Sequence, residues 1–296
     1  MHQSVLLKES IKSLDLHPGS IMVDGTLGAG GHTEEVCQEF GSGVRIFAFD
    51  LDADAIERSG ARLQDKGCDV TFHQANFKDM DEELLKAGVT SVDAILLDLG
   101  WSMDQFETGG RGLSFRKDEP LKMTLKKEIS ETEFSAYDIL NTWQEEDIAN
   151  IIYGYGEERF ARRIAREIVE RRDREPIKTT NDLVDVIMNA VPSFYKHGRL
   201  HPATKTFQAL RIAVNDELGN LREVLHKGFG LLRPGGRFSI ITFHSLEDRI
   251  VKNFFREKAS SGEAELLTKK PIIPGDEEMS ENKRSRSAKL RVIRKI

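Results

Sequence analysis

Short apolar segments alternate with helical patterns through the first hundred residues, and this alternation limits the possible folds more than any other feature. We expect strands at 20–24, 44–50, 70–73 and 94–98, with helices at 32–40 and 54–66 between them. Short apolar strands joined by helices pair in parallel and are covered on both faces of the sheet. The sequence therefore predicts an α/β fold with a mostly parallel sheet.

The pattern changes over residues 109–210, which show helical periodicities and no convincing strand. Two stripes of apolar residues four apart indicate helix faces turned toward a core: Phe160, Ile164 and Ile168, then Leu183, Ile187 and Val191. The α/β pattern returns with a helix at 221–231 and a strand at 237–243. We predict a discontinuous core, 1–108 and 211–296, interrupted by a helical substrate-recognition domain at 109–210.

A glycine-rich segment, VDGTLGAGGH, spans residues 23–32 at the end of the first predicted strand. Glycines let a ligand approach the backbone closely, and nucleotides bind at the carboxyl ends of strands in α/β sheets. A dinucleotide-binding loop would read G-x-G-x-x-G, but Thr33 stands where the last glycine is required. The segment instead resembles the first motif of S-adenosylmethionine-dependent methyltransferases, acidic-x-G-x-G-x-G, with Thr26 in the first glycine position. A purely structural turn remains the alternative.

Three further residues follow the ends of successive predicted strands. Asp50 ends the second strand, where a carboxylate can bond both hydroxyls of a ribose. Phe77 follows the third and can stack on adenine, with a place in the core as the alternative. Asp98 ends the fourth, where we expect the transferable methyl group to lie. One adenosyl-binding crevice explains the loop and all three residues together.

The charge distribution bears on possible partners. The net charge of −6 argues mildly against a protein dedicated to nucleic acid. Residues 283–296, however, carry seven cations and no acid, and we expect this segment to contact a polyanion. For the arginine-rich stretch 159–178, which also contains glutamates, a solvated helix face is the favoured interpretation.

Other features indicate the cellular setting. No apolar run reaches membrane-spanning length, and MHQSVLLKES lacks the pattern of a secretory signal, so we predict a cytoplasmic protein without a membrane span. Cys37 and Cys68 are expected to be buried, reduced thiols. His197 and His201 lack an evident third ligand, and no metal is predicted.

Several longer strings resemble one family, the bacterial small-subunit rRNA (cytosine-N4) methyltransferases known as RsmH or MraW. The matching strings span nearly the whole chain and include HQSVLL, VDGTLGAGGHT, AFDLD, YGEERFARRIA, HPATKTFQALRIAVNDEL, LRPGGRFSIITFHSLEDRIVK and NKRSRSAKLRV. The longest strings are more specific than generic methyltransferase architecture requires. The chain is thereby identified as resembling this family.

The resemblance implies a Rossmann-like methyltransferase core with an inserted helical domain. It also implies methyl transfer from S-adenosylmethionine to the exocyclic N4 of a cytidine in the decoding region of 16S rRNA, within the small ribosomal subunit. Carried over by motif, the cofactor contacts are expected to be Gly30, Gly31, His32, Asp50, Phe77, Asp98 and Gln105.

The sequence departs from the family pattern near the expected mouth of the site. The family commonly has DLGVSSPQLD where this chain has DLGWSMDQFE, which makes Trp101, Met103 and Asp104 unusual. It commonly has PLDMRM where this chain has PLKMTL, which introduces Lys122 and Thr124. These changes bear on substrate placement or on the identity of the target, and they leave the cofactor positions intact.

The chemistry needs cytosine N4 held in line with the methyl carbon and an acceptor for an N4 proton. We expect Asp98, or the backbone carbonyls of Leu99 and Gly100, to accept that hydrogen bond. Trp101 and Phe106 are candidates for stacking on the flipped base. The candidate phosphate contacts are Lys205, Arg211 and Arg249.

Three alternatives remain open from sequence. A methyltransferase of another RNA or of DNA would share the fold, and so would a non-catalytic ribosome-assembly factor. A nicotinamide enzyme is disfavoured by Thr33. The oligomeric state is open, with a homodimer among the possibilities.

Overall fold

The computed structural model describes residues 4–64, 66–99, 110–126 and 133–296. The chain forms two compact units, a sheet unit (Met1–Ser102 with Leu218–Ile296) and a helical unit (Met103–Glu217). The sequence prediction set the domain limits at 108/109 and 210/211. The two units divide instead at 102/103 and 217/218, and α11 (Ala203–Asn215) runs unbroken through residues 210 and 211.

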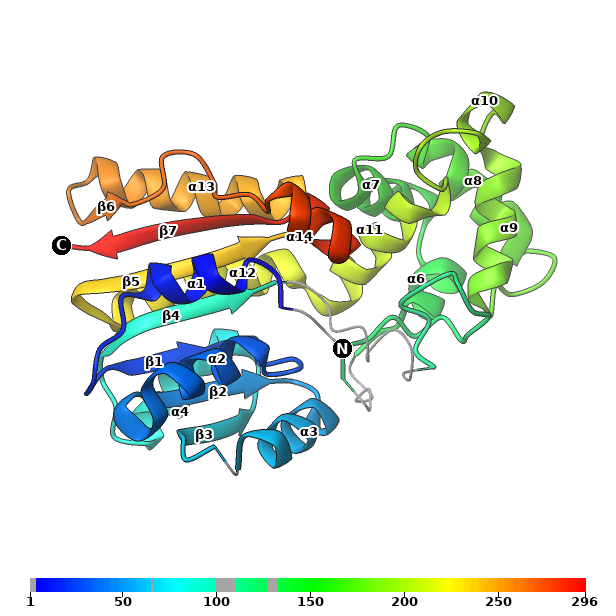
Figure 1. Cartoon of the computed structure of the whole chain (residues 1–296). Coiled ribbons are helices and arrows are strands. Elements are labelled where there is room, and N and C mark those ends of the chain that lie inside the picture. The colour runs from blue at the N-terminus through cyan, green and yellow to red at the C-terminus, as the bar shows by residue number, and fades with distance from the viewer. Residues whose placement is uncertain (1–3, 65, 100–109, 127–132) are drawn as a thin grey trace. The chain divides into compact units, whose positions relative to one another are not determined.

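The sheet unit is built on a seven-stranded sheet in the order β3-β2-β1-β4-β5-β7-β6 (Figure 1). Its strands are β1 (Ile21–Asp24), β2 (Arg45–Asp50), β3 (Asp69–Gln74), β4 (Val92–Asp98), β5 (Leu232–Thr242), β6 (Ala264–Leu266) and β7 (Lys289–Lys295). The first five strands pair in parallel, and β7 is antiparallel to both β5 and β6. The predicted mostly parallel sheet is confirmed, and β6 and β7 are additions to it.

Successive side chains of a strand point to opposite faces of the sheet, and apolar residues on both faces need cover. Helices cover both faces of this sheet. Val23, Phe47 and Ile95 belong to one buried cluster, with residues of α4 (Met80–Lys86), α12 (Glu217–Leu231) and α13 (Ser245–Ser260). Their neighbours Met22, Ile46 and Leu96 belong to another, with residues of α1 (Leu7–Leu14), α2 (Gly31–Phe40) and α3 (Ala53–Gln64). The short elements of this unit are η1 (Gly41–Gly43), η2 (Phe77–Asp79), α14 (Asp276–Glu281) and η3 (Lys283–Ser287).

The helical unit confirms the strand-poor stretch. It contains α6 (Ala136–Thr142), α7 (Glu145–Gly156), α8 (Ala161–Arg172), α9 (Thr180–Ala190), α10 (Ser193–Lys196) and α11. Five residues of the two predicted apolar stripes are buried, namely Ile164, Ile168, Leu183, Ile187 and Val191. Phe160, the first residue of the first stripe, is only partly buried and is the N-cap of α8. Capping boxes begin α6 at Ser135 and α9 at Thr179, where side-chain oxygens accept otherwise unpaired helix N–H groups.

β7 contains four of the seven cations of the basic segment 283–296. Arg291 and Lys289 pair with Asp248 of α13, and Arg294 pairs with Glu265 of β6. The Lys295 ammonium donates to three carbonyls, those of Phe229, Gly230 and Leu232. The segment has no acid of its own, but other elements supply the partners. These four side chains are therefore paired within the protein, and the expected polyanion contact of the segment stays a prediction.

The cysteine prediction is wrong. Cys37 of α2 and Cys68 ahead of β3 form a disulfide, with their Cα atoms 5.4 Å apart. The two residues are 31 positions apart, and spacing alone does not reveal that α2 packs beside the start of β3. Among the residues the structure describes, no helix is both long and apolar enough to cross a membrane.

Candidate active site

The candidate site lies at the carboxyl edge of the sheet unit. Asp24, Asp50 and Asp98 are the last residues of β1, β2 and β4, which are neighbours in the sheet. Because these strands are parallel and in register, their ends meet at the same edge. Three carboxylates from distant parts of the chain are thereby gathered beside one glycine-rich loop.

The loop between β1 and α2 is held by backbone bonds to both neighbouring strands. Gly25 N–H donates to Leu96 O of β4, and Leu27 N–H donates to Phe49 O of β2, each at 2.9 Å. A Cβ at Gly25 would overlap the Leu97 side chain, so the tight passage of the loop requires glycine there.

The end of the loop is shaped by Gly28, Gly30 and Gly31. Gly28 and Gly30 have φ values of +50° and +71°, which favour glycine. Gly30 is the N-cap of α2, and a Cβ at Gly31 would overlap Ser4 Oγ. The loop therefore carries no side chain at these three positions, where α2 begins.

The Asp24 carboxylate fixes the start of the loop through hydrogen bonds. Its carboxylate accepts hydrogen bonds from Thr33 Oγ1 (2.7 Å) and from Thr26 N–H (3.1 Å). Burial raises the pKa of Asp24, against the lowering effect of these bonds and of His32. Thr26 Oγ1 in turn accepts the N–H of Asp98 at 2.6 Å. The threonine in the first glycine position thus ties the loop to the end of β4.

Asp50 is placed by the same loop. Its Oδ2 accepts Gly28 N–H and its Oδ1 accepts Asp52 N–H, both at 2.8 Å. Burial raises the pKa of Asp50 to about 6, although the two backbone hydrogen bonds act to lower it. A carboxylate oxygen accepts more than one hydrogen bond, so each oxygen keeps acceptor capacity for a hydroxyl.

His32 and Arg284 flank Asp98. His32 Nδ1 lies 4.0 Å from Asp98 Oδ2, and His32 Nε2 lies 3.2 Å from the carbonyl of Val5. Because a carbonyl only accepts, Nε2 carries the hydrogen in that bond. Burial lowers the pKa of Arg284 of η3, while the charge of Asp98 acts to raise it, so the two groups lie within electrostatic reach.

The structure thus brings together Gly30, Gly31, His32, Asp50 and Asp98 as one group. Phe77 begins η2 and packs partly buried against the core beside Gly25, which fits the alternative of a core aromatic as well as a stacking role. Gln105 and Trp101 lie outside the described residues, as do Met103, Asp104 and Phe106.

The candidate phosphate contacts are dispersed. Lys205 donates to the Glu157 carbonyl (2.7 Å), and Arg211 makes a two-pronged ion pair with Glu217 (2.8 and 3.0 Å), all within the helical unit. Arg249 lies on the exposed side of α13 in the sheet unit. The Arg211 guanidinium is therefore paired with a carboxylate in this structure. Substrate binding by Lys205, Arg211 and Arg249 stays a prediction.

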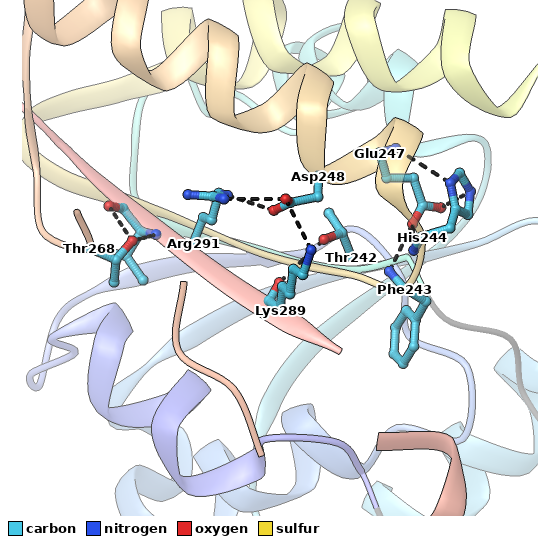
Figure 2. A network of polar contacts seen from close by, with 9 residues as sticks. Thr242, Phe243, His244, Glu247, Asp248, Thr268, Lys289 and Arg291 are labelled. Carbon is cyan, nitrogen blue, oxygen red and sulfur yellow. Dashed lines mark hydrogen bonds and ion pairs between the residues drawn. The ribbon is translucent and has the colours of Figure 1, made fainter. Parts of the chain in front are cut away.

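A second polar network fixes the end of β5 (Figure 2). His244 caps α13, and Glu247 Oε2 accepts the N–H groups of Phe243 (2.8 Å) and His244 (3.2 Å). Asp248 pairs with Arg291 at 2.7 Å, and both residues are buried. The network locks α13 and β7 to β5, whose Ile241 pairs with Asp98 in the sheet.

Sequence reasoning missed the roles of Thr26 and Arg284. Thr26 was noted only as a departure from a glycine motif, and nothing in the local sequence points its hydroxyl to the N–H of Asp98, 72 positions away. Arg284 was grouped with the basic segment, and nothing in the local sequence points to Asp98.

Comparisons with known proteins show the family to which the chain belongs. The model of the MraW methylase family matches residues 1–296. A protein named ribosomal RNA small subunit methyltransferase H from Clostridioides difficile is 43% identical over 310 residues, covering 100% of this chain and 99% of its own. The protein of the same name from Desulfotalea psychrophila is 45% identical over 296 residues, covering 100% and 98%. A third, from Brevibacillus brevis, is 41% identical over 310 residues, covering 100% and 98%.

Proposed function

Since the chain belongs to the MraW methylase family, we propose that it is an S-adenosylmethionine-dependent methyltransferase of small-subunit ribosomal RNA. The reaction we assign to it is methylation of the exocyclic N4 of a cytidine in the decoding region of 16S rRNA. The substrate is the RNA within the small subunit, which places the protein in the cytoplasm. The observation that carries this proposal is the gathering of the glycine loop, Asp50 and Asp98 at one sheet edge.

The residues present fit the proposed cofactor. The glycine loop would offer backbone groups to the methionine portion, and Asp50 offers two acceptor oxygens for the ribose hydroxyls. Phe77 and Gln105 complete the contacts that we propose, together with His32 and Asp98. When bound, S-adenosylmethionine supplies an electrophilic methyl group.

The protein's task is to position cytosine N4 and to accept its proton. The N4 lone pair is delocalised into the ring, so a hydrogen-bond acceptor beside the amino group favours attack. We assign this role to the Asp98 carboxylate, whose side chain is 21% exposed and therefore open to a substrate. Thr26 holds the Asp98 backbone, the Arg284 guanidinium lies within electrostatic reach of its carboxylate, and His32 lies beside it.

Labelled S-adenosylmethionine tests this function. We expect label to enter small subunits that lack the modification, at a single cytidine N4 that nuclease mapping identifies. Free 16S rRNA, added in parallel, tells whether the assembled subunit is needed. Label found on DNA, on protein or on a different RNA position would contradict the proposal.

Cofactor affinity should depend on pH through Asp50. The ionised carboxylate accepts hydroxyl hydrogen bonds, and with a pKa of about 6 it becomes mostly neutral below that pH. We expect the affinity for S-adenosylhomocysteine to fall about fourfold from pH 7.5 to 5.5, as measured by calorimetry. Asp50→Asn should bind weakly at pH 7.5 and lose this pH dependence; an unchanged dependence would assign it to another group.

The raised pKa of Asp50 affects folding stability in the opposite direction, because it favours the folded state at low pH. A carboxyl whose folded-state pKa is raised favours the folded state below its unfolded pKa, here 3.8. That contribution is lost as the pH rises through about 6. The ligand-free protein therefore holds Asp50 ionised at neutral pH at a cost in folding free energy that the proposed hydroxyl contacts offset.

We expect stability and methyl transfer to depend on the hydroxyl of Thr26 rather than on the shape of its side chain. Thr26→Val keeps the branched side chain but removes the acceptor of the Asp98 N–H, so we expect a loss of about 1 kcal/mol in unfolding free energy. The end of β4 then loses its fixed position, and methyl transfer should slow about tenfold. Thr26→Ser retains the hydroxyl and should behave like the wild type in both measurements. Equal behaviour of the valine and serine variants would remove Thr26 from the positioning of Asp98.

A further inference from the structure

The helical unit carries an exposed group of aromatic rings around one arginine, which we call the Arg159 cluster: Arg159, Phe160, Phe194 and Tyr195. The Arg159 guanidinium carbon lies 4.8 Å from the centre of the Phe160 ring, 5.5 Å from Phe194 and 5.0 Å from Tyr195. The rings of Phe160 and Tyr195 meet edge to face at 4.9 Å. Phe194 is 66% exposed, although burial is the ordinary state of a phenylalanine.

The buried Glu158 side chain holds the Arg159 cluster in place. Glu158 is fully buried and accepts hydrogen bonds from Phe160 N–H (2.8 Å) and from the Tyr195 hydroxyl (2.5 Å). Burial and the bond to Glu158 raise the pKa of Tyr195 to about 12, so its hydroxyl stays a donor. The start of α8 and the short helix α10, which Figure 1 shows in the same unit, are thereby joined at this point. A rigid aromatic surface binds a flat partner with little loss of conformational freedom.

The surroundings of the cluster are cationic. Five further basic residues lie on or next to α8 and α10: Arg162, Arg163, Arg166, Lys196 and Arg199. Arg163 also contacts the Phe160 ring, at 5.9 Å from its centre. Across the described ranges, none of these five side chains has a carboxylate partner, which sets them apart from the paired cations of β7. Glu167 and Glu170 follow Arg163 and Arg166 by four positions on α8, which is about one helical turn.

Exposed rings interleaved with unpaired cations match the chemistry of single-stranded RNA. Bases stack on aromatic faces and on arginine planes whatever their sequence, and ammonium and guanidinium groups contact the phosphates. A protein partner would instead be expected to present carboxylates to so many cations or to cover more apolar surface than one ring. A solvated helix face, the interpretation favoured from sequence, does not account for the exposure of Phe194.

We propose that the Arg159 cluster binds a single-stranded segment of the RNA substrate, with Phe194 stacked on a base and the surrounding cations on phosphates. The assignment of RNA as the substrate rests on the proposed function. The cluster belongs to the helical unit alone, so it acts in binding and takes no part in the chemical step.

Substitution of Phe194 tests the stacking. Phe194→Ala should weaken binding of a short, unstructured RNA oligonucleotide about tenfold, as measured by fluorescence anisotropy, because one stacked base is lost. Phe194→Trp should restore the affinity, since it keeps a stacking face. Tyr137→Ala is the matched control: Tyr137 is also exposed (38%) but belongs to α6, which contacts α8 at Arg172, the end away from the cluster. Thermal unfolding of each variant checks that it folds.

Removal of the cations tests the phosphate contacts. The double variant Arg163→Gln/Lys196→Gln should lower the slope of log affinity against log salt by about 1 to 2, with Arg174→Gln, at the far end of α8, as the control. Affinity for S-adenosylhomocysteine should stay at the wild-type value for all of these variants.

The outcomes separate this inference from the proposed function. If the wild type methylates small subunits but Phe194→Ala binds RNA as the Tyr137→Ala control does, the cluster proposal is overturned and the function stands. If the wild type transfers no methyl group to RNA, the function fails, and the oligonucleotide measurements still decide whether the cluster binds RNA. Loss of binding to subunits with unchanged binding to naked RNA would assign the cluster to a protein partner and overturn the proposal.

Discussion

Replacing Asp98 with alanine is expected to lower the single-turnover rate of methyl transfer about 100-fold to 1,000-fold. The carboxylate is the group that we assign to accept the N4 proton, and removal of one such transition-state contact has effects of this size. The fold should tolerate the change, because the Asp98 side chain is partly exposed and its backbone bond to Thr26 does not involve the carboxylate.

Rapid quenching with labelled cofactor and unmodified small subunits measures this rate directly. Calorimetry with S-adenosylhomocysteine provides the control, because a variant that merely fails to bind the cofactor would show it there. Asp98→Asn keeps an acceptor oxygen without the charge and should fall between alanine and the wild type. A wild-type rate in the alanine variant would remove the Asp98 carboxylate from the mechanism.

Replacing Asp248 with alanine should lower the free energy of unfolding by about 3–5 kcal/mol. The change leaves Arg291 buried without its carboxylate, and an unpaired buried charge costs far more than the ion pair contributes. The double variant Asp248→Leu/Arg291→Met removes both charges and should recover most of the loss. Denaturant unfolding of the wild type, Asp248→Leu, Arg291→Met and the double variant yields the coupling between the two side chains. Equal losses in the single and double variants would show that packing, rather than charge, determines the effect.

Acid should weaken the same contact. Burial alone would raise the pKa of Asp248, but Arg291 and Lys289 lower it overall. A carboxyl with a lowered folded-state pKa stabilises the fold above its unfolded pKa of about 3.8, and this contribution is lost as the pH falls through the folded-state value. The Asp248→Ala variant should therefore differ from the wild type at neutral pH and approach it below about pH 4.

The parallel part of the sheet could be predicted because its signals are local. Each of the first four strands is a short apolar run bounded by a turn or a helix, and the parallel arrangement then fixes where the strand-end acids meet. Asp50 and Asp98 were identified on this ground alone. β7 was missed because cations alternate with its apolar residues, and the acids that neutralise them, Asp248 and Glu265, come from other elements.

The remaining features depend on contacts between distant segments. Thr26 acts on a residue 72 positions away, and Arg284 reaches the same residue from the other end of the chain. The disulfide between Cys37 and Cys68 likewise follows from the packing of α2 against the start of β3. The exposure of Phe194 depends on how Glu158 anchors Tyr195, a contact across 37 positions. Local patterns carry no information about such approaches, so only the folded chain reveals them.

The position of β7 has a consequence for biosynthesis. It is the last of the seven strands to leave the ribosome, yet it sits between β5 and β6 in the finished sheet. Until residues 289–295 emerge, β5 keeps an open edge next to the apolar Ile240 and Ile241, and such edges invite pairing with other chains. A ribosome that stops shortly before this strand would accordingly release an aggregation-prone polypeptide rather than a weakened enzyme.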